Sequence, residues 1–300
     1  MHVIMSFLFI TMMFIMIPRA FVSAQRIGAV LDVEPTVRDR EQTVTLADAK
    51  GRVEFRDVSF AYPDAEEKTL DDISFTAEPG KTTAIIGGTG CGKSTLISLI
   101  PRFYDVTEGS ITLDGIDVRD MKQHDLRENI GYVPQKGLLF SGTIGTNLQY
   151  GREDATLAEM TDAAETAQAM EFISEKENGF DEEVSQGGTN VSGGQKQRLS
   201  IARALVKKPK VYIFDDSFSA LDFRTDKALR EALSEKVGDS TIIIVAQRIN
   251  TIIDADQIIV LEEGRIAGRG THEELLANCS VYKEIALSQL SEKELERGRA

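Results

Sequence analysis

A glycine-rich run from Gly87 to Thr95, GGTGCGKST, is the feature that most constrains the fold of this chain. It fits the pattern G-x-x-x-x-G-K-[ST], in which backbone N–H groups cradle phosphates, the lysine reaches the β- and γ-phosphate oxygens and the hydroxyl holds Mg²⁺. The short apolar run Thr83–Ile86 precedes it, and a helix is expected to follow from Thr95. Because such a loop requires a strand before it and a helix after it, the sequence predicts a nucleotide-binding α/β core.

Two later segments add to this chemistry. Val191–Gln195, VSGGQ, opens a predicted helix with the capping box Ser192-x-x-Gln195, and its small residues leave the free N–H groups and the positive end of the helix dipole open to a phosphate. The apolar run Val211–Phe214 ends in Asp215 and Asp216, which places two carboxylates at the end of a buried strand. In this order, the three segments resemble the nucleotide-binding domain of an ABC transporter.

The resemblance covers residues 51–290 and implies a P-loop NTPase core of ABC type, with a helical subdomain at about 141–208 and an antiparallel β subdomain. It implies ATP and Mg²⁺ as cofactors. The residues that it assigns to the nucleotide are Tyr62, Gly87, Gly88, Thr89, Gly90, Cys91, Gly92, Lys93, Ser94, Thr95, Gln135, Ser192, Gly193, Gly194 and Gln195. Those that it assigns to the metal are Ser94, Gln135 and Asp215. Tyr62 stands where the family has an aromatic ring that stacks on adenine.

Asp216 and Gln247 depart from the family pattern, which has Glu and His at these positions. A general base must reach its proton at about 2.6–3.2 Å, and Asp216 is one methylene shorter than Glu. A misplacement of about 1 Å can cost roughly a hundredfold in rate. Gln247 can donate a hydrogen bond but cannot carry the charge of an imidazole. We therefore expect Asp216 and Gln247 to be the catalytic residues of a slow site, as in the degenerate half of heterodimeric multidrug or lipid exporters.

In that arrangement, Ser192–Gln195 completes the ATP site of a second ABC nucleotide-binding subunit, expected to be a different chain. The pair couples ATP binding and hydrolysis to export through a transmembrane domain, at the cytoplasmic face of the cell membrane. The alternative is a regulatory module that holds ATP without hydrolysing it. A soluble ABC protein of DNA repair or translation is a third hypothesis. Such a protein is expected to contain a long coiled coil or a second copy of the motifs, and this sequence has neither.

The beginning of the chain, Met1–Ile17, is uncharged and almost wholly apolar. Its length is at the lower end of the range of about 17–25 residues that spans a bilayer. We expect residues 1–24 to be the end of a transmembrane helix, flanked on the cytoplasmic side by Arg19 and Arg26. A signal peptide cleaved near residues 21–24 would carry a basic residue before the apolar run, and a buried core helix is the remaining alternative.

The other divisions follow from composition. Residues 25–50 are expected to form a linker, 51–285 the nucleotide-binding domain and 286–300 a charged tail. The chain has 48 acidic against 34 basic side chains and a net charge of −14, which argues against nucleic acid as a partner. Two cysteines, Cys91 and Cys279, are too few for a disulfide framework and fit a reducing compartment. The rest of a membrane domain is expected in a longer form of the chain or in a separate chain.

Overall fold

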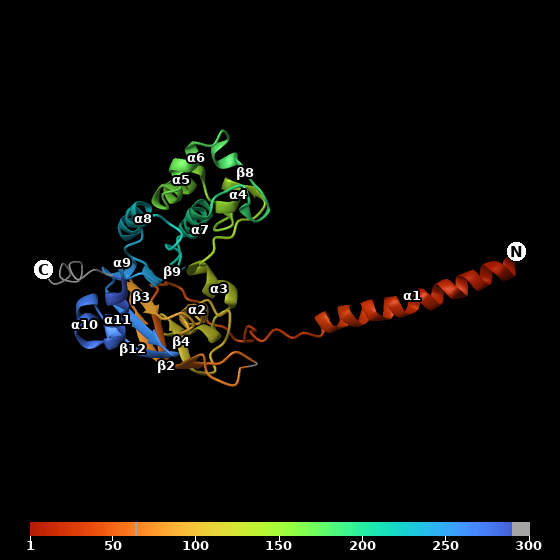
Figure 1. Cartoon of the computed structure of the whole chain (residues 1–300), viewed down its shortest axis with the longest axis horizontal. Helices are drawn as coiled ribbons and strands as arrows, with labels where there is room; N and C mark the ends of the chain where they lie inside the picture. The colour runs from red at the N-terminus through yellow and green to blue at the C-terminus, as the bar shows by residue number, and fades with distance from the viewer. Residues whose placement is uncertain (64, 290–300) are drawn as a thin grey trace. The chain divides into compact units, whose positions relative to one another are not determined.

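The structure is a computed structural model that describes residues 1–63 and 65–289, and it divides into two compact units, Met1–Arg38 and a second that begins at Asp39 (Figure 1). The first unit is the helix α1, His2–Leu31, none of whose residues is buried. It is the one helix in these two ranges that is long and apolar enough to cross a membrane. The helix continues beyond residue 24 into the expected linker.

A six-stranded sheet forms the centre of the second unit, in the order β12-β11-β3-β10-β9-β6. The strands are β3 (Thr82–Gly87), β6 (Ile130–Val133), β9 (Val211–Asp215), β10 (Thr241–Val245), β11 (Gln257–Glu262) and β12 (Arg265–Gly270). All neighbours pair in parallel except β12, which forms an antiparallel hairpin with β11. Because parallel strands end at the same edge, the segments that follow β3, β6, β9 and β10 meet there.

Both faces of this sheet are covered, which explains the unbroken apolar runs in its sequence. Successive residues of a strand point to opposite faces. Ala84 and Ile86 therefore belong to the core beneath the helices, whereas Ile85 between them packs into the core shared with an antiparallel sheet. Ile243 and Ile244 of β10 divide between the same two cores.

The antiparallel sheet is the expected β subdomain, with strand order β2-β1-β4-β5. Its strands are β1 (Val53–Phe60), β2 (Leu70–Ala77), β4 (Glu108–Leu113) and β5 (Ile116–Asp117). Phe55 and Phe75 are register partners, and their rings stack with centroids 4.6 Å apart. The short helix α2, Lys93–Ser98, contributes Leu96 and Ile97 to the core between the two sheets. The helix thus fixes the phosphate loop to both sheets.

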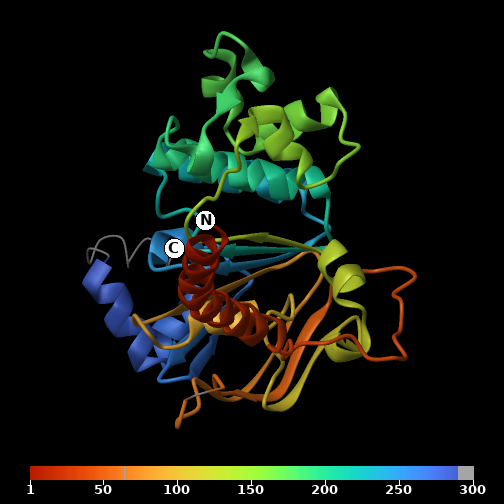
Figure 2. The same ribbon diagram turned by 90° about the vertical axis from the view of Figure 1, so that its right-hand side faces the viewer.

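The helical subdomain lies within the predicted range, and Figure 2 shows its helices together on one side of the sheet. It holds the short pair β7 (Gly142–Thr143) and β8 (Glu183–Val184), with α4 (Ile144–Gln149), α5 (Leu157–Thr166), α6 (Met170–Ser174) and α7 (Gly193–Lys207). The predicted capping box of Ser192 with Gln195 is present, and α5 begins with a second one, Thr156 with Glu159. The helix α7 ends at Lys207, where a second lysine and Pro209 follow, as is common at the C-terminal end of a helix.

The later part of the second unit also contains the helices α8 (Phe223–Lys236), α9 (Ile249–Ile252), α10 (His272–Asn278) and α11 (Ser280–Gln289). The last of these helices, α11, overlaps the first residues of the expected charged tail. Residues 286–289 belong to the end of α11, and the remainder of that tail lies outside the described residues.

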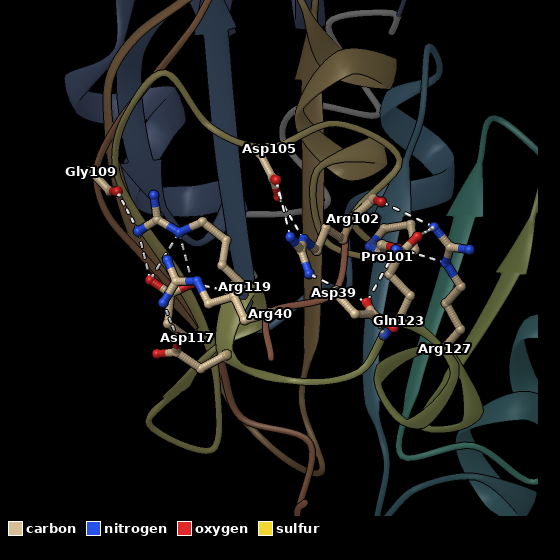
Figure 3. Close-up of polar contacts among 11 residues, drawn as sticks. Asp39, Arg40, Pro101, Arg102, Asp105, Gly109, Asp117, Arg119, Gln123 and Arg127 are labelled. Atoms are coloured by element: carbon tan, nitrogen blue, oxygen red, sulfur yellow. Dashed lines mark hydrogen bonds and ion pairs between the residues drawn. The ribbon is translucent and has the colours of Figure 1, made fainter. Parts of the chain in front are cut away.

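The second half of the expected linker is bound to the domain through the polar contacts in Figure 3. Helix α3, Gln123–Glu128, has no side-chain cap from its own N-cap residue Lys122. Instead, Asp39 Oδ1 accepts hydrogen bonds from the backbone N and from Nε2 of Gln123, at 3.0 and 3.1 Å. The backbone bond is the main reason that the pKa of Asp39 is lowered. Arg40 pairs with Asp120 beside it, so the linker supplies the cap that α3 lacks.

Candidate nucleotide-binding site

The phosphate loop between β3 and α2 needs glycine at two positions for reasons of packing. A Cβ atom at Gly87 would lie 2.1 Å from the carbonyl oxygen of Leu261 in the neighbouring strand. Gly92 has φ of +100°, and a Cβ there would lie 2.8 Å from Cδ2 of Leu70. L side chains rarely adopt that backbone conformation. The loop is therefore held close to both sheets, and its shape depends on these two glycines.

Lys93 bends back over the loop that precedes it. Its Nζ donates to the carbonyl oxygens of Gly87 and Gly88, at 2.9 and 2.6 Å, and lies 3.7 Å from the Sγ atom of Cys91. The ammonium group thus sits within the glycine-rich turn, where it can neutralise phosphate oxygens. Cys91 is buried, so a group added to its sulfur would have to displace part of this loop.

Asp215 joins the phosphate loop to the central strands. Its side chain accepts from Ser94 Oγ at Oδ1, 3.0 Å away, and from Tyr132 Oη at Oδ2, 3.3 Å away. Burial raises the pKa of Asp215, the nearby charge of Asp216 adds to the rise, and the hydrogen bonds and Lys93 oppose it. Burial also raises the pKa of Tyr132, which keeps its hydroxyl protonated as a donor. The sequence analysis did not assign Tyr132, whose position depends on the register of Tyr132 opposite Ile213.

These oxygen atoms suit Mg²⁺. A hydroxyl, a carboxylate and the amide oxygen of Gln135 are the hard ligands that this cation prefers. Across residues 1–63 and 65–289, no group of three or more His, Cys, Asp or Glu side chains could hold a metal ion. A magnesium ion here would therefore use few protein ligands, with phosphate oxygens and water as the others.

Asp216 accepts hydrogen bonds from both glutamines that follow neighbouring strands. Its Oδ2 lies 3.0 Å from Gln135 Nε2 and 2.8 Å from Gln247 Nε2. The residue is 7% exposed and has a left-handed backbone with φ of 47°, a conformation that Asp tolerates better than most residues. The structure therefore brings Asp216, Gln135 and Gln247 together at the ends of β9, β6 and β10.

The loop that carries Gln135 is also tied to the helical subdomain by Gln197 of α7. Its Oε1 accepts from the backbone N of Gly137 at 2.9 Å, and its Nε2 donates to the carbonyl oxygen of Pro134 at 3.1 Å. Gln197 is only 1% exposed. A buried glutamine within a helix gives no sequence signal beyond its position, and the sequence analysis missed it. Through it, the segment that begins at Ser192 is linked to the Gln135 loop.

Tyr62 lies beside the phosphate loop. Its hydroxyl is 3.1 Å from Oγ1 of Thr95, and its ring meets that of Tyr104 edge to face with centroids 5.2 Å apart. The side chain is 36% exposed, so part of the ring is free to contact a planar group. This position suits the expected stacking on a base.

The remaining predicted segment, Ser192–Gln195, lies elsewhere. Its capping box is formed within α7 alone, by Ser192 N to Gln195 Oε1 at 3.0 Å and Gln195 N to Ser192 Oγ at 3.3 Å. Ser192 and Gly193 are exposed, and a Cβ at Gly193 would meet nothing within 4 Å. Among the residues described, no hydrogen bond joins this segment to the phosphate loop. The chain thus brings together the residues around the phosphate loop, whereas the segment Ser192–Gln195 stays apart from them and exposed at its start.

Comparisons with known proteins agree with this geometry. Residues 70–219 match the family model described as ABC transporter. The chain is 47% identical over 292 residues to an uncharacterized ABC transporter ATP-binding protein of Mycobacterium bovis, covering 96% of this chain and 50% of the relative. It is 43% identical over 260 residues to an ATP-dependent lipid A-core flippase of Desulfotalea psychrophila, covering 87% of this chain and 45% of that protein.

Among solved structures, a bacterial Atm1-family exporter with ATP bound matches with a TM-score of 0.87 and 38% identity, over 92% of this chain and 48% of that one. The predicted nucleotide-binding fold is therefore confirmed. This chain spans about half the length of the curated relatives that it matches. The roles of single residues remain predictions that rest on the contacts above.

Proposed function

We propose that this chain, which belongs to the ABC transporter family, couples ATP binding and hydrolysis to export, with a slow ATP site of its own. Ser192–Gln195 at the start of α7, here called the signature segment, would complete a partner's site. Members of this family bind ATP and use it in transport, and the relatives include exporters. Within this chain, Lys93 would neutralise the β- and γ-phosphates and Tyr62 would stack on the base. Ser94, Asp215 and the amide oxygen of Gln135 would hold Mg²⁺, which stabilises charge on the transferring phosphate.

The arrangement around Asp216 is the observation that carries the proposal. A general base needs a lone pair directed at the attacking water. Oδ2 of Asp216 instead accepts from two amide groups, those of Gln135 and Gln247, which occupy the lone pairs of that oxygen and leave only Oδ1 to face a water. The side chain is also shorter than the Glu of the family pattern. Water activation is therefore expected to be poor, although the phosphate-binding residues are intact.

The open segment Ser192–Gln195 supports the second half of the proposal. Its free N–H groups and the positive end of the α7 dipole can bind a phosphate. Because this segment makes its described hydrogen bonds within α7, the phosphate would belong to a second nucleotide-binding subunit. We propose a different chain that carries Glu and His at the positions of Asp216 and Gln247. The pair would lie at the cytoplasmic face of a membrane, with α1 as the end of a transmembrane helix.

The alternative is a module that holds ATP as a regulator and hydrolyses none. The amide groups of Gln135 and Gln247 on Asp216 also favour this non-hydrolysing alternative for the chain's own ATP site. The two functions differ in what happens when a partner is added. A regulatory module would bind Mg-ATP with no increase in turnover, whereas the proposed subunit would bind Mg-ATP and raise the activity of the pair.

The test uses the purified full chain, with Mg-ATP binding measured by equilibrium dialysis and phosphate release followed in parallel. We expect binding with very slow turnover alone. Adding a partner with Glu and His at the two positions should restore turnover at the partner's site. Turnover by the chain alone at the rate of an ordinary exporter domain would contradict the slow site, and no gain with the partner would favour the regulatory alternative.

A further inference from the structure

The short segment between β10 and α9 carries Gln247, and a residue from a distant helix holds its backbone. Gln289, at the end of α11, accepts a hydrogen bond from the backbone N of Ile249 at Oε1, 2.9 Å away. Its Nε2 donates to the carbonyl oxygen of Gln247 at 2.8 Å. One side-chain amide thus satisfies a donor and an acceptor of the same loop, as a neighbouring strand would do.

This contact is the outer end of a chain of hydrogen bonds that reaches the ATP site. Gln289 fixes the backbone of Gln247, and the side chain of Gln247 donates to Oδ2 of Asp216 at 2.8 Å. Gln247 is exposed, so packing does little to hold it, and the direction of its side chain depends on these bonds at its two ends. Loss of the backbone contact would give the loop more conformations, of which few would place the Gln247 amide on Asp216.

The helix that carries Gln289 is itself firmly placed. Tyr282 and Ala286 of α11 are fully buried, and the Tyr282 hydroxyl lies 2.7 Å from Nδ1 of His272 in α10. The neighbouring face of α11, with Val281 and Ile285, lines a cleft of about 530 Å³ together with phosphate-loop residues 88–91. One helix therefore borders the phosphate loop and also holds the loop of Gln247.

We infer that Gln289 is a positioning residue for the ATP site, through which helix α11 sets Gln247 against Asp216. The inference rests on the proposed function for its effect on turnover, whereas the contact itself does not depend on it. Gln289 does not touch the reacting atoms. Its part is to limit the loop to the conformation in which the Gln247 side chain meets the carboxylate.

The primary measurement is amide hydrogen exchange at Ile249 in the full chain. In Gln289→Ala, the Ile249 amide loses its acceptor and should exchange about tenfold faster. Gln289→Glu keeps an acceptor for Ile249 but removes the donor to the Gln247 carbonyl, so exchange at Ile249 should stay close to the unmodified chain. Unchanged exchange in Gln289→Ala would overturn the inference, whatever the ATPase activity.

A neighbouring substitution serves as the matched control. Leu287 is 53% exposed on the same helix. Leu287→Gln places an amide there in addition to Gln289, and it should leave exchange at Ile249 unchanged. If Gln289→Ala weakened α11 as a whole, amide exchange would also rise at Tyr282. The Gln289→Glu variant, whose side chain is as long as that of glutamine, then tests the contact by itself, because exchange at Ile249 should stay close to that of the unmodified chain.

Turnover provides the second measurement, in a pair with the partner and in a chain that also carries Asp216→Glu and Gln247→His, so that this site is active. In that chain the backbone of residue 247, which Gln289 holds, carries the introduced imidazole, so the measurement tests the backbone contact. There, Gln289→Ala and Gln289→Glu should both lower kcat about fivefold while KM for ATP changes less than about twofold, since the phosphate loop is untouched. Equal kcat in all three chains would overturn the positioning role. A pair without measurable turnover contradicts the proposed function and leaves the exchange result to judge the contact.

Discussion

The phosphate-loop side and the signature side of this chain contain similar small-residue helix starts, but they differ in how much of their surroundings the chain supplies. Asp215 and Asp216 are each 7% exposed and are hydrogen-bonded to side chains from several elements. Ser192 and Gly193 are exposed, and their described hydrogen bonds stay inside α7. The first region is a connected set of carboxylate, hydroxyl and amide groups, whereas the second is an open helix start, for which we propose a phosphate held by a partner.

We expect the two regions to bind different phosphate groups, although hydrogen bonds connect them structurally. Gln197 belongs to the signature helix, yet it holds the backbone on both sides of Gln135, whose amide contacts Asp216. A movement of α7 upon a partner's phosphate would therefore reach this chain's own carboxylate. Substitutions in each region should consequently give separate binding effects and a shared effect on activity.

The largest effect is expected from Lys93→Ala. Removing the ammonium that lies within the phosphate loop should weaken Mg-ATP binding to this chain about a hundredfold, the equivalent of roughly 3 kcal/mol for a charge-assisted contact. Equilibrium dialysis with the isolated full chain measures it. Lys196→Ala, beside the signature residues on α7, is the control and should leave this affinity within about twofold. Equal losses in the two variants would contradict the separation of the regions.

Gly193→Asp should act on the partner's site instead. A carboxylate at the start of α7 opposes phosphate charge and fills the space that glycine leaves, so turnover of the reconstituted pair should fall about twentyfold. Affinity of this chain alone for Mg-ATP should hardly change. Gly193→Ala controls for the added Cβ, which meets nothing within 4 Å in this chain. Unchanged turnover in Gly193→Asp would leave the chain a self-contained nucleotide-binding module.

Restoring the family residues tests whether the carboxylate is what limits the phosphate-loop region. Asp216→Glu combined with Gln247→His should raise turnover at this site about tenfold when a partner supplies its signature, because the base regains reach and the imidazole replaces an amide. Glu suits the left-handed backbone at position 216 less well than Asp, so a stability loss of about 1 kcal/mol is expected. Asp216→Ala with Gln247→His is the inactive control. Equal rates in both would place the defect elsewhere.

The smallest expected effect is on the free energy of unfolding, which a substitution in the phosphate-loop region should raise and one in the signature region should lower. Burial raises the pKa of Asp215, so its charge destabilises the folded chain above that folded-state pKa, and the penalty disappears as pH falls below the pKa of the unfolded chain. Asp215→Asn should therefore raise the unfolding free energy at pH 7, and raise it less at pH 5. Ser192→Ala, which removes an N-cap, should lower it by about 1 kcal/mol. Urea unfolding at pH 7 and 5 measures both, and a loss in Asp215→Asn would contradict the prediction.

The parts of the fold that local sequence determines were predictable. The glycine loop, the two capping boxes and the end of α7 at Lys207 each depend on residues within a few positions of one another. The same is true of the apolar runs that became β9 and β10. These local features are sufficient to predict the fold class from the sequence.

The contacts that complete the site were not predictable in this way. Tyr132 reaches Asp215 across 83 positions in the sequence, and Gln197 reaches Pro134 across 63. Each depends on strand register or on the placement of a helix, which only the assembled core determines. The convergence of Gln135 and Gln247 on one oxygen of Asp216 has the same origin. Motif reading assigned all three residues to the site, but not the bonds between them.

The cap that Asp39 provides for α3 has a practical consequence for dissecting this protein. Motifs and strand patterns place the start of the nucleotide-binding domain at residue 51, but a fragment cut there would leave the first N–H group of α3 without its carboxylate and Asp120 without Arg40. Such a fragment should unfold at a lower urea concentration than one that starts at Asp39, by an amount near that of a lost helix cap, about 1 kcal/mol. The shortest piece suited to independent expression therefore begins at Asp39, well before the first strand at Val53.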